Sequence, residues 1–124
     1  MDSSKVYRFE ELEQMFPKSV KELKLFINNL LLHNNVPDDV IDEETQAICQ
    51  YTINSANPLL FQFMDAHKIY IVIDCMDYIE GKEWVSMVIN TDLEVKETRT
   101  DAMVLAFNEA FVILEKQLEN ESSN

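Results

Sequence analysis

Glycine is almost absent from this chain, because Gly81 is the only one among 124 residues. Loops that hold phosphate groups need several glycines, since the backbone must approach the ligand closely and adopt positive φ. The sequence therefore excludes a P-loop and a dinucleotide-binding fingerprint. We expect no cofactor.

Basic residues are the second shortage. Ten Lys and Arg stand against 23 Asp and Glu, which gives a formal net charge of −13 at pH 7. Affinity for a nucleic-acid backbone comes mainly from Lys and Arg side chains that displace condensed counterions. Direct binding of DNA or RNA is therefore not expected.

The negative charge is distributed unevenly along the chain. Residues 1–24 contain five acids and five bases, whereas residues 25–67 contain no Lys or Arg. A surface built from this segment either keeps the protein soluble or complements a basic partner. The acids of the base-free segment are Asp38, Asp39, Asp42, Glu43, Glu44 and Asp65.

Cysteines and long apolar runs are also scarce. The two cysteines, Cys49 and Cys75, have no secretory context, because the N-terminus has neither the charged start nor the apolar stretch of a signal peptide. The aliphatic runs are too short to cross a membrane. We expect a cytoplasmic protein with reduced, buried thiols and no membrane contact. The length predicts one domain over 1–124, with a disordered polar tail at 119–124.

Apolar residues at helical spacing predict three helices in the first half of the chain and one at its end. Ser19 and Glu22 have the spacing of a capping box just after Pro17, which predicts a helix over 19–33. Helices are also expected over 8–15 and from about 38–42 to 54–57. The last helix is expected to begin at Thr98 or Thr100, either of which can cap it, and to end between 117 and 120.

From Ile69 onward the apolar period changes to two, which indicates a β-hairpin. Strands are predicted over 69–76 and 84–89, with a turn centred on 80–82 that places Gly81 where a hairpin loop needs positive φ. Segment 59–64 is either a preceding strand or a helix capped by Asn57 with Pro58 at its first position, and we prefer the strand. The predicted class is α+β: N-terminal helices, an antiparallel two- to three-stranded meander, and a long C-terminal helix packed on the sheet.

Two of the predicted helices carry a second apolar ridge. Leu25 and Leu32 lie seven residues apart and away from the main stripe of their helix, and Leu105 and Val112 do the same in the last helix. A second ridge indicates that a helix is covered on two sides. The cover is either another element of the chain or a partner, which includes a second copy in a homo-oligomer.

The residues that usually carry catalysis do not form a recognisable motif. His33 and His67 are the only histidines, and neither has a second ligand at a metal-binding spacing. A pair formed by folding, His67 with Cys75 or Cys49, stays open as an alternative to structural roles. The acidic cluster lacks the ligand spacing of a calcium loop. We therefore expect no catalytic, cofactor-binding or metal site, and a protein that is not an enzyme.

Aromatic residues gather around the predicted hairpin. Tyr70, Tyr78 and Trp84 either form cross-strand pairs or make an exposed patch beside Asp74, which would serve as an aromatic anchor with an acidic rim. Together with the helix ridges, they complete the set of candidate partner-binding residues: Leu25, Leu32, Leu105, Val112, Tyr70, Asp74 and Trp84.

The segment 84–118 resembles the closing strand and helix of small phage and prophage domains of the α/β sandwich type. The resemblance rests on the sequences ETRTDA at 97–102 and AFNEAF at 106–111, which match a Thr-capped final helix with paired alanines. It implies a phage-associated accessory protein in the host cytoplasm. It transfers no functional residue.

The leading hypothesis is a non-enzymatic interaction protein that offers an acidic surface and apolar helix ridges to a protein partner. One alternative is an acidic inhibitor or decoy that occupies the nucleic-acid-binding surface of a basic protein. A second alternative is a small acidic dimeric chaperone, similar to type III secretion chaperones in size, charge and mixed α/β content.

Overall fold

The protein, seen in a computed structural model, has an α+β fold that confirms the predicted class. The structure describes residues 2, 4–55, 58–78, 81–88, 94–96 and 98–122. In chain order, the described elements are α1 (Phe9–Met15), α2 (Pro17–His33), α3 (Ile41–Ser55), α4 (Pro58–Ala66), β1 (Ile71–Tyr78), β2 (Gly81–Val88), β3 (Glu94–Lys96) and α5 (Arg99–Ser122).

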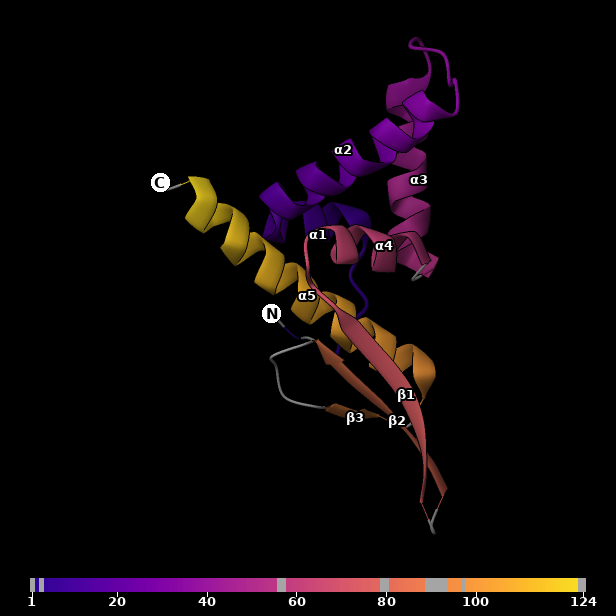
Figure 1. The fold of residues 1–124 in the computed structure, drawn as a ribbon, viewed down its shortest axis with the longest axis vertical. Coiled ribbons are helices and arrows are strands. Elements are labelled where there is room, and N and C mark those ends of the chain that lie inside the picture. The colour runs from indigo at the N-terminus through magenta and orange to yellow at the C-terminus, as the bar shows by residue number, and fades with distance from the viewer. Residues whose placement is uncertain are drawn as a thin grey trace.

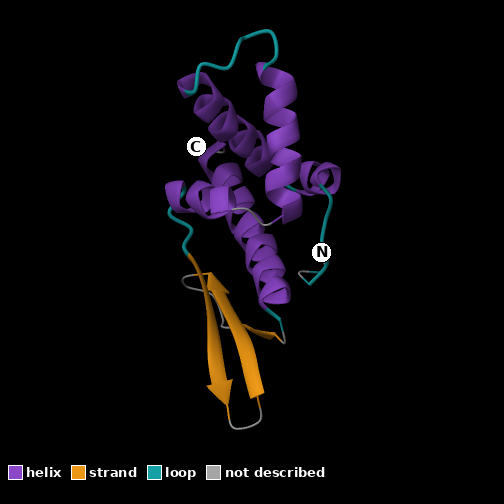
Figure 2. Cartoon of the chain, turned by 90° about the vertical axis from the view of Figure 1, so that its right-hand side faces the viewer, coloured by secondary structure: helices purple, strands orange, loops and turns teal. Residues whose placement is uncertain are grey.

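Helix α5 crosses the whole molecule and joins a helical body to a small sheet (Figure 1). Its first half packs against β1, β2 and β3, and it also contacts α2 on the other side of the molecule. Helices α2 and α3 pack against each other. The hairpin of β1 and β2 extends away from the helices (Figure 2).

The core lies where α5 meets the helical body. Aromatic rings dominate it, with Phe16 stacked on Phe111 at 5.9 Å between ring centroids and Phe61 edge-on to Phe107 at 4.8 Å. The largest fully buried side chains come from every helix: Phe9, Val20, Leu23, Ile27, Cys49, Thr52, Leu60, Phe63, Met64, Phe111 and Leu114, with Val88 from β2.

The sheet is antiparallel with strand order β1-β2-β3, and it confirms the predicted hairpin. The predicted alternation also holds, because Ile69 is buried whereas Tyr70 and Val72 are exposed. The turn is displaced from its predicted centre, since Gly81 already belongs to β2 and pairs with Tyr78. Residues 79–80, between the two strands, lie outside the described residues.

The preferred strand at 59–64 is wrong, because this segment forms helix α4 with Pro58 as its first residue. Proline is well suited to that position, since its fixed φ is helical and it has no N–H to leave unpaired. The third strand of the sheet is instead β3, at 94–96. Asn57, the predicted cap, lies outside the described residues.

The end of α4 is a Schellman-type turn that directs the chain into the hairpin. Lys68 has a φ of 63°, and the Ile69 N–H donates to the Met64 carbonyl five residues earlier at 2.9 Å. A positive φ costs most residues energy, because Cβ crowds the backbone. This turn buries Ile69 and starts the alternation of β1.

The predicted capping box at Ser19 is wrong, because α2 begins two residues earlier at Pro17. The carboxylate of Glu115, from α5, satisfies the first free donors instead. The Lys18 N–H donates to Glu115 Oε2 at 3.2 Å, and the buried Ser19 N–H donates to Glu115 Oε1 at 2.8 Å. The next N–H, from Val20, already donates to the Phe16 carbonyl within the helix.

The start of α5 agrees with one of the two predicted caps. The Asp101 N–H donates to Thr98 Oγ1 at 3.1 Å, so Thr98 caps the helix and Thr100 does not. The helix then continues to Ser122, four residues into the segment predicted as a disordered tail. That prediction is therefore wrong for 119–122.

Replacement of Glu115 by Gln should lower the free energy of unfolding by about 1–3 kcal/mol, because buried backbone donors lose their charged acceptor. Glu121→Gln, which changes an exposed acid on the same helix, is the control and should have almost no effect. Urea unfolding followed by circular dichroism measures both variants. Equal stability of the two variants would contradict the capping role of Glu115.

Replacement of Lys68 by Gly should raise the free energy of unfolding by about 0.5–1 kcal/mol, because glycine adopts positive φ without a steric cost. Asn35 provides a matched control, since it occupies the same conformation after α2 with a φ of 62°. Asparagine tolerates this conformation better than lysine, so Asn35→Gly should gain less than Lys68→Gly in the same denaturation experiment. A loss of stability for Lys68→Gly would contradict this reading of the turn.

Candidate protein-binding surface

The outer side of α2 and α3 carries exposed leucines next to a shallow recess. Leu25 and Leu32 lie one above the other on α2, and their exposed fractions are 49% and 48%. The recess has a volume of about 400 Å³. It is lined from α2 by Lys21, Lys24, Leu25 and Asn28 and from α3 by Asp42, Thr45 and Gln46.

Acidic side chains border this side of the molecule. They surround the α2–α3 connection and the first turn of α3, and all five are exposed: Asp38, Asp39, Asp42, Glu43 and Glu44. We call Leu25, Leu32 and these five acids the acidic α2–α3 face. Acids at a helix start are stabilised by the helix dipole, which explains part of the cluster without any partner.

The bases beside the acidic α2–α3 face are too few to neutralise its five acids. The Lys24 ammonium pairs with the Glu13 carboxylate of α1 and lies 5.5 Å from the centre of the Phe9 ring. Lys21 is exposed and lines the same recess as Leu25 and Asp42, where it adds one positive charge. Beyond Lys24, the sequence contains no Lys or Arg until residue 68, so the charge of the face stays negative.

The second apolar ridge of α5, unlike that of α2, is not exposed. Leu105 is buried with an exposed fraction of 6%, and Val112 is partly buried against the core. The cover of this ridge is therefore the chain itself. Of the two predicted ridges, only the ridge on α2 remains open for a partner.

The hairpin residues separate onto two faces of the sheet. Trp84 pairs with Cys75 in the register and shares the face of Ile73, whereas Tyr70, Val72 and Asp74 occupy the alternate positions. The idea of one aromatic patch that joins Tyr70 and Trp84 is therefore wrong. The side chain of Tyr78 lies outside the described residues.

Trp84 contacts a cation that the sequence did not predict. The Arg99 guanidinium carbon is 4.4 Å from the centre of the Trp84 ring, a cation–π contact between the first residue of α5 and β2. A second recess of about 400 Å³ opens beside this pair. It is lined by Phe61, Ile73, Asp74, Cys75, Trp84, Arg99 and Met103.

The histidines and cysteines do not assemble into a reactive centre. The His67 ring packs edge-on against Phe63 at 4.9 Å and does not line the recess beside Cys75. His33 is exposed in the last turn of α2, where a cation suits the helix dipole. Within the described part of the chain, no three His, Cys, Asp or Glu side chains form a group that could hold a metal ion.

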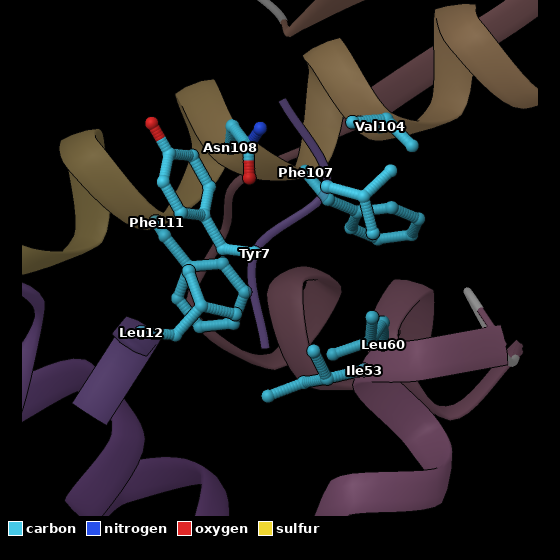
Figure 3. Close-up of a pocket in the computed structure, with 9 residues that line it drawn as sticks. Tyr7, Leu12, Ile53, Leu60, Val104, Phe107, Asn108 and Phe111 are labelled. Atoms are coloured by element: carbon cyan, nitrogen blue, oxygen red, sulfur yellow. The ribbon is translucent and has the colours of Figure 1, made fainter. Parts of the chain in front are cut away.

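A third pocket lies inside the helical body, under the N-terminal segment (Figure 3). Tyr7 and Leu12 face Phe111 across one end of it, and the Asn108 side-chain amide anchors the segment above by donating to the Lys5 carbonyl at 2.8 Å. The pocket has a volume of about 40 Å³. That is space for a few water molecules, far below the volume of a metabolite site.

Comparisons with known proteins found no relative, because no family model, curated protein or solved structure matches the chain. None of the described helices combines the length and the apolar character that crossing a membrane requires. Any proposal for the function therefore rests on the surfaces described above.

The two thiols should differ in reactivity with the disulfide reagent DTNB at pH 8. Burial raises the pKa of Cys49 to about 11, so almost no reactive thiolate forms there, whereas Cys75 is partly exposed beside its recess. We expect one thiol to react in the native protein and the second only after unfolding. Cys75→Ser should abolish native labelling, and Cys49→Ser should not. Rapid native labelling of both thiols would contradict the burial of Cys49.

Proposed function

We propose that this chain is a non-enzymatic interaction protein that binds a basic protein partner through the acidic α2–α3 face. The observation that carries the proposal is the pair Leu25 and Leu32, half-exposed leucines on one side of α2, with Asp42 lining the same recess as Leu25 and four more exposed acids in the α2–α3 connection and the first turn of α3. Exposed apolar side chains with a polar rim are typical of protein interfaces.

The energetics of the face indicate that charge determines the partner. Full burial of a leucine stabilises by about 1.5–3 kcal/mol, so covering the exposed halves of two leucines contributes only about 1.5–3 kcal/mol in all. Association costs at least about 4 kcal/mol in lost translation and rotation. The remainder must come from other contacts, and a partner with Lys or Arg opposite the five acids supplies both attraction and faster encounter.

The same charge disfavours a second copy as the occupant. Each chain carries a net charge of −13, and the acidic α2–α3 face would meet its own acids across a two-fold interface. Like charges opposed across an interface are destabilising. The proposal therefore favours a different, basic protein over the homo-oligomer and the dimeric chaperone.

The resemblance of residues 84–118 to phage and prophage domains supports a phage-encoded accessory protein that acts in the host cytoplasm. The decoy alternative uses the same acids but does not need the leucines, and this difference separates the two hypotheses.

The test compares partner capture by three variants with capture by the wild-type chain. Leu25→Ser with Leu32→Ser removes the apolar part of the face, Asp42→Asn with Glu43→Gln and Glu44→Gln removes charge, and Val6→Ser changes an exposed apolar residue elsewhere. In quantitative mass spectrometry after affinity capture from host extract, the first two variants should lose the same basic protein at least tenfold. The Val6→Ser variant should retain it.

Two other outcomes would reject this proposal. Undiminished capture by the double serine variant, with capture that falls steeply as salt increases, would indicate the electrostatic decoy instead. Retention of every captured protein by both variants would show that the acidic α2–α3 face is only a solvated surface. Circular dichroism of each variant controls for loss of folding.

A further inference from the structure

Among the described strands, β1 lies at an edge of the sheet. The order β1-β2-β3 places it at one end, where it pairs along all eight residues with β2 on its inner side. The hairpin also extends away from the helices (Figure 2), and none of the described strands pairs with the outer side of β1. An open edge presents a row of free backbone donors and acceptors to which another extended chain can add.

One hydrogen bond shows which backbone groups face outward. The Cys75 N–H donates to Oδ1 of the adjacent Asp74 at 2.8 Å, so it points away from β2. Because backbone groups alternate in direction along an antiparallel strand, the N–H groups of Ile71 and Ile73 point to the same open side. The exposed Asp74 carboxylate therefore occupies one of the positions that an added strand would use.

The recess beside Trp84 lies next to this edge. Ile73 and Cys75 of β1, Phe61 of α4 and Met103 of α5 line it with apolar side chains, and Arg99 and Asp74 each add one charge, of opposite sign. A strand added to β1 would direct alternate side chains to the face of this recess. The intervening side chains would lie on the outer face, beside Val72 and Asp74.

Charge favours a basic strand over a second copy of this chain at the edge of β1. A second copy would bring its own Asp74 and a net charge of −13 to an edge that already carries a carboxylate, which is unfavourable. A Lys or Arg on the outer face of the added strand would instead attract the Asp74 carboxylate away from the Cys75 N–H. That N–H would then be free to donate to a carbonyl of the added strand.

We propose that β1 binds an extended segment of a partner by strand addition, with apolar side chains toward the recess and a basic side chain opposite Asp74. Asp74 acts as the selecting residue, because it blocks the edge until a cation draws it aside. This site is separate from the acidic α2–α3 face and does not depend on the function proposed for that face.

The test uses two synthetic eight-residue peptides with blocked ends. Both have valine at alternate positions and threonine between them, and one central threonine is replaced by lysine in the first peptide and by glutamate in the second. Amide hydrogen exchange of the full chain, followed by NMR, reports on the backbone of β1. We expect the lysine peptide to slow exchange of the Ile71, Ile73 and Cys75 amides at least tenfold.

Affinities measured by calorimetry complete the test. The glutamate peptide should bind about tenfold more weakly than the lysine peptide, because attraction becomes repulsion beside Asp74. Asp74→Asn should remove this difference, whereas Glu83→Gln, an exposed acid on the neighbouring strand, should preserve it. The Leu25→Ser, Leu32→Ser variant should bind both peptides as the wild type does.

Three results would overturn the proposal. They are unchanged exchange of the β1 amides with the lysine peptide, equal affinity of the wild-type chain for both peptides, and protection of the same amides by the protein alone as its concentration rises. The last result would assign the edge to a second copy of the chain. Folding of each variant is checked by its NMR spectrum before titration.

Discussion

The hydrogen bonds from the N-terminus of α2 to Glu115 hold together the two helices on which the rest of the structure depends. The first N–H groups of a helix have no partner within it, and leaving them buried and unpaired is costly. Here Pro17 has no N–H to satisfy, and the two oxygens of Glu115 accept from Lys18 and Ser19. This contact fixes α2 against the second half of α5, and α3 packs on α2 in turn.

The positions of both proposed surfaces therefore depend on α5. The acidic α2–α3 face takes its position from α2, which packs on α5, and from α3, which packs on α2, whereas the hairpin rests on the first half of α5. A helix of 24 residues is about 36 Å long. The two surfaces thus belong to different ends of the molecule, and a partner can occupy one of them without contact with the other.

Much of the fold could be predicted from the sequence, because periodicity reports directly on which side of an element is buried. The hairpin, the cap at Thr98 and the helices over the first half of the chain all follow from local patterns. The segment 59–64 could not be resolved in this way, since five apolar residues interrupted only by Gln62 fit a buried helix and a buried strand equally well. The cap of α2 could not be found either, because its acceptor lies 96 residues away from Ser19.

The candidate surfaces were predictable to a smaller extent. The ridge pattern correctly marked Leu25, Leu32, Leu105 and Val112 as unusual, but the same pattern arises whether the cover is internal or a partner. Only the packing of the chain shows that Leu105 is buried and Leu25 is not. Arg99 lies on α5 and Trp84 on β2, and no local spacing in the sequence indicates that these two elements bring them into contact.

The position of Glu115 along the chain also has a consequence during synthesis. A ribosome makes α1–α4 and the hairpin before it makes α5, so until then the growing chain has neither the acceptor for the α2 donors nor the large apolar side chains of α5. The N-terminal helices cannot complete their core ahead of the segment that closes it, and stable folding must wait for that segment to leave the ribosome. Until α5 emerges, Phe16 and Phe61 lack Phe111 and Phe107, the rings on which they pack in the finished protein.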